Sequence, residues 1–223
     1  MTISPPQVVP VMFWQDADGR APVRDWLKTL SAEDQKFIAE DIRDVGYSYE
    51  GNALAKSVRR PLCEITSYLP DGRMTGIFYI IFGHQLLLLH AYVKDTPKAP
   101  KPDMDIAWDM VSQEAGLKKA YPWSSLDSWL REEGIYESVT VMALRRALMR
   151  ELTMRVSKMS EWKDERVPLF LTLRALDMLP VCSNLVAALQ TLNHAAQAID
   201  LEVHLNLVDA GKSRRITSMT LRG

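Results

Sequence analysis

Cysteine is scarce in this sequence, and its placement fits neither a redox protein nor a zinc protein. Cys63 and Cys182 lie far apart and match no metal-binding or redox spacing. We expect both to be buried thiols in a reducing cytosol. His194 and His204 have no framework of carboxylates or cysteines around them, so we expect no metal and no other cofactor.

Long apolar runs and a secretion leader are also missing. The apolar run Leu86–Leu89 is far too short to cross a bilayer, which takes about 20 residues of helix. Residues 1–13 contain three prolines and no basic n-region, which argues against a signal peptide. We therefore expect a cytoplasmic protein that makes no membrane contact.

The chain carries no strong net charge. Its formal charge of -1 gives no overall attraction to nucleic acid or to a membrane surface. Residues 52–101 differ, because they contain three acidic residues and seven basic ones, namely Lys56, Arg59, Arg60, Arg73, Lys94, Lys98 and Lys101. A local excess of this kind can bind a polyanion even when the whole chain is not basic.

Hydrophobic patterns in the first half predict an α+β domain. Residues 8–15 are apolar and β-prone, as in a strand, and residues 16–20 form a turn. Pro22 begins a helix with an apolar face. Ser31 caps a second helix, which ends at Gly46.

Three further strands are predicted over residues 62–69, 73–82 and 85–93, followed by a helix over residues 103–114. Because these strands are close in sequence, we expect an antiparallel meander. The last of them is almost entirely apolar, as is typical of a central strand buried on both faces. The predicted order of elements is β-α-α-β-β-β-α.

The second half of the chain has a different character. Residues 116–124 have the composition of a linker, and the pattern that follows is mainly α-helical. A short helix over residues 126–134 is followed by a long one capped by Thr140. Two more helices (169–179 and 184–199) and a C-terminal strand or hairpin (201–208 and 216–221) are predicted. We therefore predict two domains, 1–115 and 125–223.

Four stretches of the first half carry a resemblance to a known family. They are Pro22–Leu27, Leu62–Ile65, Phe78–Tyr79, and Leu87–Lys94 with Thr96, Lys98, Pro100 and Asp103–Ala107 after it. Together they resemble the phage-derived Gp49-like, or HigB, branch of the RelE toxin superfamily. The resemblance covers about residues 10–113 and implies a RelE-like toxin fold.

Two stretches of the second half resemble, more loosely, a HigA-like antitoxin of the Xre type. They are Leu126–Glu137 and Thr191–Ile199, the latter followed by Leu201–Asp209. The resemblance implies a toxin and its antitoxin fused in one chain, in the order that this family uses. It also implies a DNA-binding helix-turn-helix, but Ser160–Leu179 shows no clean recognition helix.

Toxins of this superfamily cut mRNA, usually on the ribosome. The reaction needs a base near the 2'-hydroxyl, cations around the scissile phosphate and an acid for the leaving oxygen, but no metal. The resemblance assigns this work to two arginines whose positions are Thr66 and Gly76 here, and its paired lysines are Lys94 and Asp95. Each lost cation would slow cleavage on the order of 10²–10³-fold, which predicts a weak or inactive mRNA interferase.

The remaining basic residues fall into two groups of candidates. The catalytic candidates are Arg73, Lys94 and Lys98. The RNA-binding candidates are Arg59, Arg60 and Lys101. A solvated strand edge and loop would explain the same charges equally well. His90 could carry a proton, although its apolar strand indicates a core residue instead.

The apolar residues after the linker are candidates for a toxin–antitoxin interface: Trp129, Leu130, Ile135 and Tyr136. A short linker gives an effective concentration of roughly millimolar, so even weak docking would persist. Packing within their own domain is the alternative. Arg145, Arg146, Arg150 and Arg155 recur along the next helix and would meet DNA phosphates or solvent.

Three hypotheses follow. The first is a toxin–antitoxin-derived fusion whose RelE-like domain is weak or inactive and is masked by the fused segment. The second is an active but self-inhibited endoribonuclease, and the third is a non-enzymatic phage or mobile-element regulator that binds DNA or protein. Their partners would be mRNA or the ribosome, operator DNA, the chain's own second half, or a second copy in a homodimer.

Overall fold

The chain divides into two compact units. The computed structural model describes residues 9–47, 53–112, 123–158, 204–208 and 215–220. The first unit comprises Met1–Ala143 and the second comprises Leu144–Gly223. The division therefore falls inside a helix, whereas the sequence predicted a linker at 116–124, most of which lies outside the described residues.

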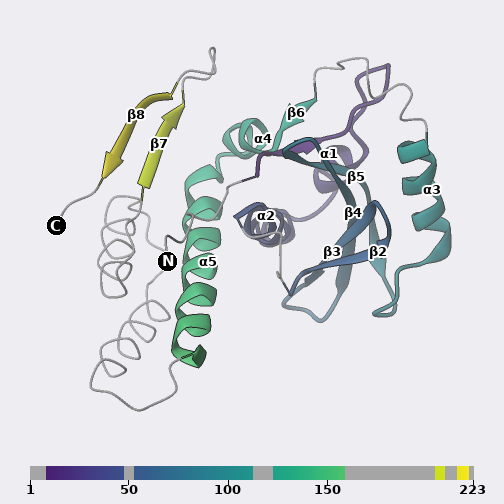
Figure 1. The fold of residues 1–223 in the computed structure, drawn as a ribbon. Helices are drawn as coiled ribbons and strands as arrows, with labels where there is room; N and C mark the ends of the chain where they lie inside the picture. Colours follow the sequence, from purple (N-terminus) through teal and green to yellow (C-terminus); the bar gives the residue numbers. More distant parts are fainter. Residues whose placement is uncertain (1–8, 48–52, 113–122, 159–203, 209–214, 221–223) are drawn as a thin grey trace. The chain divides into compact units, whose positions relative to one another are not determined.

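A six-stranded sheet forms the centre of the first unit. Its strands are β1 (Val11–Phe13), β2 (Ala55–Arg59), β3 (Leu62–Tyr68), β4 (Met74–Phe82), β5 (Gln85–Lys94) and β6 (Ser124–Ser125). Strands β2 to β5 form an antiparallel meander, β1 lies parallel to β5, and β6 pairs antiparallel with β1 (Figure 1). The predicted meander is confirmed, and β5 is central with four buried leucines, Leu86 to Leu89.

Several ends of the described helices lie at capping residues that can be recognised in the sequence. The helices are α1 (Pro22–Leu27), α2 (Ala32–Tyr47), α3 (Lys101–Ser112), α4 (Leu126–Glu132) and α5 (Tyr136–Lys158). Ser31 precedes α2, and its Oγ accepts a hydrogen bond from the backbone N–H of Asp34 at 3.2 Å, as predicted. Ser125 caps α4 in the same way, with Ser128 as the donor at 3.0 Å. Gly134 has a φ of 71° and separates α4 from α5.

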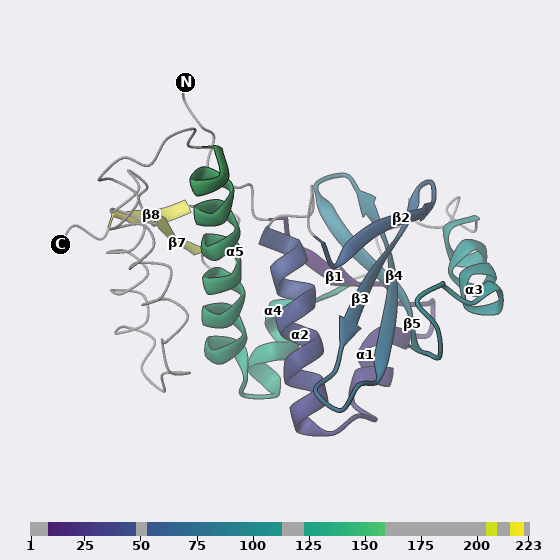
Figure 2. The same cartoon turned by 90° about the horizontal axis from the view of Figure 1, so that it is seen from below.

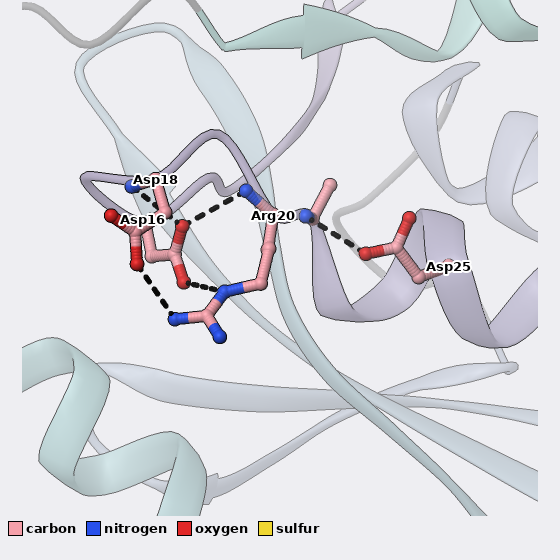
Figure 3. A network of polar contacts seen from close by, with 5 residues as sticks. Asp16, Asp18, Arg20 and Asp25 are labelled. Atoms are coloured by element: carbon pink, nitrogen blue, oxygen red, sulfur yellow. Dashed lines mark hydrogen bonds and ion pairs between the residues drawn. The ribbon is translucent and has the colours of Figure 1, made fainter.

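The turn between β1 and α1 is held by the carboxylate of Asp16 (Figure 3). Its Oδ1 accepts hydrogen bonds from the backbone N–H groups of Asp18 at 3.0 Å and Arg20 at 2.9 Å, and its Oδ2 accepts one from Arg20 Nε at 2.7 Å. The backbone hydrogen bond from Arg20 lowers the pKa of Asp16 below its usual value. Asp25 then accepts a hydrogen bond from the backbone N–H of Ala21 at 3.2 Å, which fixes the entry into α1.

The sheet has a hydrophobic core on each face. Helix α2 covers the core on one face, and α3 covers the core on the other (Figures 1 and 2). The core on the α2 face includes Phe13, Ile42, Ile65, Ile77, Leu88 and Trp129. The core on the α3 face includes Leu62, Phe78, Ile80, Leu89, Tyr92 and Val111. Because side chains alternate along a strand, each side chain of β3 to β5 belongs to one of these two faces.

The described part of the second unit consists of the rest of α5 and a two-stranded hairpin. Strand β7 (His204–Val208) pairs antiparallel with β8 (Arg215–Thr220), which confirms the predicted C-terminal hairpin. The helices predicted over 169–179 and 184–199, and the segment where a helix-turn-helix was expected, lie outside the described residues.

Several elements differ from the sequence-based prediction. Strands β2 and β6 were not predicted, α3 begins two residues before Asp103, and α5 begins at Tyr136 rather than after Thr140. Cys63 is half-buried, and burial raises the pKa of its thiol, whereas Cys182 lies outside the described residues. Among the described helices, none combines the length and apolar character needed to cross a membrane.

Candidate functional site

A buried polar cluster lies on the α3 face of the sheet, among Glu64, Thr66, Tyr92 and Lys94 (the Glu64 cluster). Both the Lys94 and the Glu64 side chains are fully buried, and Lys94 Nζ lies 2.5 Å from Glu64 Oε1. Lys94 Nζ also donates to Thr66 Oγ1 at 3.3 Å, and the Tyr92 hydroxyl donates to Glu64 Oε1. The ammonium and the phenol therefore share one carboxylate oxygen.

The strand register brings these residues together. Thr66 on β3 is opposite Gly76 on β4, and Gly76 is opposite Tyr92 on β5, so the three form one row across the sheet. Lys94 is two residues beyond Tyr92 and points to the same face. The Lys94 side chain extends along this face past Thr66 and contacts Glu64, which lies two residues before Thr66 on β3.

Gly76 leaves room for the ring of Tyr92. A Cβ at residue 76 would lie 2.4 Å from Tyr92 Cζ and 2.5 Å from its hydroxyl oxygen, far inside any normal contact. The ring also packs against Phe78, with centroids 5.0 Å apart. Burial, and then the hydrogen bond to Glu64, raise the pKa of Tyr92 well above its usual value. The position where the resemblance places a catalytic arginine is thus filled by a neutral phenol.

The electrostatic character of the Glu64 cluster is that of a closed ion pair. Lys94 is neutralised by Glu64, and neither side chain reaches the surface. A phosphate could contact the Lys94 ammonium only after displacing a carboxylate that already binds it at 2.5 Å. Separating Lys94 from Glu64 would leave an unpaired charge buried, at a cost of about 3–5 kcal/mol. The ion pair therefore resists opening.

Exposed cations surround the cluster on two neighbouring segments, β2 with the following turn and the loop before α3. Lys56, half exposed, lies 3.2 Å from Glu64 Oε2 and donates to the backbone oxygen of Pro97 at 3.2 Å, which ties β2 to that loop. The Arg59 guanidinium stacks over the ring of Trp108, 3.7 Å from its centroid. The predicted RNA-binding residues Arg60 and Lys101 are exposed, as is Lys98.

Arg73 points elsewhere. Its Nη2 lies 2.8 Å from Asp34 on α2 and its Nε lies 2.5 Å from Asp71 in the β3–β4 turn. Because α2 covers the other face of the sheet, the Arg73 guanidinium is directed away from the face that carries the Glu64 cluster. Among the three predicted catalytic residues, the structure does not bring Arg73 and Lys94 together, and Lys98 stands exposed in the loop.

His90 connects the sheet to α3. Its Nε2 lies 2.9 Å from Asp103 Oδ1, and its ring stacks on Tyr92 with centroids 6.2 Å apart. The side chain is 18% exposed, so His90 is neither a dry core residue nor a freely accessible one. This contact fixes the first turn of α3 beside the Glu64 cluster.

The four residues predicted as a toxin–antitoxin interface lie together on the α2 side. Trp129 and Leu130 are fully buried in the core of the α2 face, and Ile135 and Tyr136 pack against it. The Trp129 ring meets Phe13 edge-on at 5.9 Å. This is the face opposite Lys94, so these four residues do not cover the Glu64 cluster.

Sequence reasoning missed two residues of this arrangement, Glu64 and Arg43. Glu64 was a single acid in a strand, and only the register of β3, β4 and β5 shows that it meets Lys94. Arg43 was an unremarked charge on α2, although it binds Asp127 and Thr140 from the segment after α3. Within the described residues, no group of three or more histidines, cysteines or carboxylates could hold a metal ion.

Comparison with known proteins places the Glu64 cluster inside a family match. Residues 25–112 match the family described as phage derived protein Gp49-like (DUF891). This part of the chain is therefore similar to that family. The match supports the Gp49-like resemblance over these residues, which run from within α1 to the end of α3 and include Glu64, Gly76, Tyr92 and Lys94. No curated protein and no solved structure matches the chain.

Proposed function

We propose that this protein derives from a toxin–antitoxin system and that its Gp49-like domain cleaves RNA weakly or not at all. The observation that carries this proposal is the Glu64 cluster, in which Tyr92 fills the space over Gly76 and Glu64 neutralises Lys94. Cleavage needs cations that stabilise the negative charge developing around the phosphate in the transition state. At this position the chain offers a phenol and a closed ion pair instead.

The exposed cations support contact with RNA that does not lead to cleavage. Lys56, Arg59, Arg60, Lys98 and Lys101 lie on β2, the following turn, the loop before α3 and its first residue. Such residues bind phosphates without regard to sequence, and their contribution weakens as salt rises. We therefore propose mRNA, free or on the ribosome in the cytoplasm, as the class of partner for this surface.

We propose that the second half is antitoxin-like. The proposed loss of cleavage follows from the Glu64 cluster itself and does not require the second half to shield that cluster. The apolar residues of α4 and the start of α5 pack on the α2 face, away from Lys94, whereas Trp123 packs against Phe82 in the core of the α3 face. Self-inhibition, the second hypothesis, would require some other part of the chain to shield the exposed cations. The compact unit Met1–Ala143 retains the packing of α4, so a truncation after Ala143 is a better isolated domain than one at residue 115.

Expression in bacteria tests the proposal. The full chain, the 1–143 truncation and the full-length Lys94→Met variant are induced, growth is followed, and transcript 5' ends are mapped. We expect normal growth and no new 5' ends for all three. New ends that vanish with Lys94→Met, when the variant accumulates as folded protein to the wild-type level, would contradict the proposal. Arrest by the truncation alone would support a self-inhibited enzyme.

A further inference from the structure

We propose that β1 and the outer side of α2 form a docking surface for a strand-and-helix segment, which residues 124–143 of this chain occupy in cis. We further propose that Arg43 is the residue that positions the segment. Residues 124–143 lie beyond the Gp49-like match, which ends at residue 112, while α2 lies within it. The inference concerns association, so it does not depend on whether RNA is cleaved.

The strand part of the segment adds to an open edge of the sheet. Ser124 and Ser125 form β6, which pairs with Phe13 and Met12 of β1. Gln15 donates a hydrogen bond to Ser124 Oγ at 3.3 Å. Without β6, the outer edge of β1 would present unpaired backbone groups, which is how sheets accept an added strand from a partner.

The helix part supplies an aromatic anchor. Leu126, Trp129 and Leu130 form one face of α4, and all three are fully buried in the core of the α2 face. Trp129 meets Phe13 edge-on at 5.9 Å. A buried tryptophan surrounded by leucines, at the end of an added strand, has the composition of an interface hot spot rather than of a loosely attached tail.

Arg43 contacts the polar side of the same segment. From α2 it forms an ion pair with Asp127 in the first turn of α4 and donates to Thr140 Oγ1 of α5 at 3.3 Å. Its guanidinium also lies over the ring of Tyr136, 5.4 Å from the centroid. The Arg43 side chain is only 9% exposed, so these contacts are made in a largely dry site. One residue thus contacts both helices of the segment and fixes the angle between them.

A second ion pair lies at the other end of α4, between Arg24 Nη2 of α1 and Glu132 Oε2 at 2.5 Å. The segment that fits this surface is therefore defined by its chemistry. It is a short strand followed by an amphipathic helix with buried Trp and Leu and with one acid at each end. Residues 124–143 have this pattern, and a second copy of the chain could offer it only by exchanging the segment.

Cutting the chain between its parts tests the proposal. A site for a specific protease is inserted between residues 116 and 117 of the full-length protein, which is purified and then cleaved. We expect the two fragments to co-elute as a one-to-one complex at micromolar concentration. Separation of the fragments without denaturant would overturn the docking surface. A complex of two cut chains, or capture of a tagged intact copy, would overturn docking in cis.

Variants of the cut protein test the role of Arg43. Asp127→Asn leaves the core intact because Asp127 is 40% exposed, and it should raise the dissociation constant of the fragments by about tenfold or more, as should Arg43→Ala. Combined, the two changes should cost little more than one alone. The matched control is Glu133→Ala, an exposed acid at the end of α4, which should leave the constant unchanged. Equal affinities for Asp127→Asn and wild type would overturn the positioning role.

Discussion

The ring of Tyr92 lies so close to the backbone of Gly76 that a Cβ at residue 76 would stand 2.4 Å from Tyr92 Cζ. Glycine in the middle of a sheet is unfavourable by itself, because it packs nothing and loses more backbone freedom than other residues. Here the close approach of the Tyr92 ring explains why glycine occupies position 76. The two residues are therefore expected to change together, since tyrosine at 92 requires glycine at 76.

We predict that Gly76→Ala destabilises the protein by about 1–3 kcal/mol, because the new methyl group overpacks the site against a buried ring. Urea denaturation followed by circular dichroism measures the free energy of unfolding. In a Tyr92→Leu background the same change should cost almost nothing, because the obstructing ring is gone. If Gly76→Ala were equally costly in both backgrounds, the contact with Tyr92 would not explain the glycine.

We predict that Glu64→Gln destabilises the protein by about 3–5 kcal/mol, because it leaves the Lys94 ammonium buried without a counter-charge. The comparison is again the free energy of unfolding in urea. Adding Lys94→Met to Glu64→Gln should recover part of the loss, because the uncompensated charge is removed. Lys56→Ala is the matched control. Lys56 is 49% exposed, so losing its contact with Glu64 should cost less than about 1 kcal/mol.

Alkaline pH should weaken the fold through Tyr47, the last residue of α2. Burial raises the pKa of Tyr47 from 10.0 to about 12, so the folded state keeps a proton that the unfolded chain loses first. Stability from this residue is complete below pH 10 and falls as pH approaches 12, by about 2–3 kcal/mol in total. Tyr47→Phe should lose correspondingly less stability than wild type between pH 9 and pH 12. An identical pH dependence in the two proteins would contradict this assignment.

Much of the first unit could be predicted because its signals are local. Alternating and continuous apolar runs, the turns near Gly72 and Gly83, and caps such as Ser31 place β3, β4, β5, α1 and α2. Strand β2 was missed because Ala55–Arg59 has one strongly β-prone apolar residue and sits at the sheet edge. Strand β6 has two residues, and only its pairing with β1 makes it a strand.

The candidate site was less predictable because its decisive contacts join residues distant in sequence. Lys94 was predicted as a catalytic cation, but it is buried and forms an ion pair with Glu64, which lies 30 positions earlier. Arg73 was predicted as a catalytic residue, but the structure directs its side chain toward Asp34. The loss of the family arginines at Thr66 and Gly76 was visible in the sequence. The phenol and ion pair that replaced them required the strand register.

The most direct test is cleavage of ribosome-bound mRNA by the purified full-length protein, with wild type and Lys94→Met compared at equal concentration under single-turnover conditions. We predict no cleavage above the rate without protein, and no difference between the two proteins, because the Lys94 ammonium is held by Glu64 beneath the surface. Cleavage by wild type that is abolished in Lys94→Met, with circular dichroism showing that the variant is still folded, would show that the ion pair opens to reach RNA, and would contradict the proposed loss of activity.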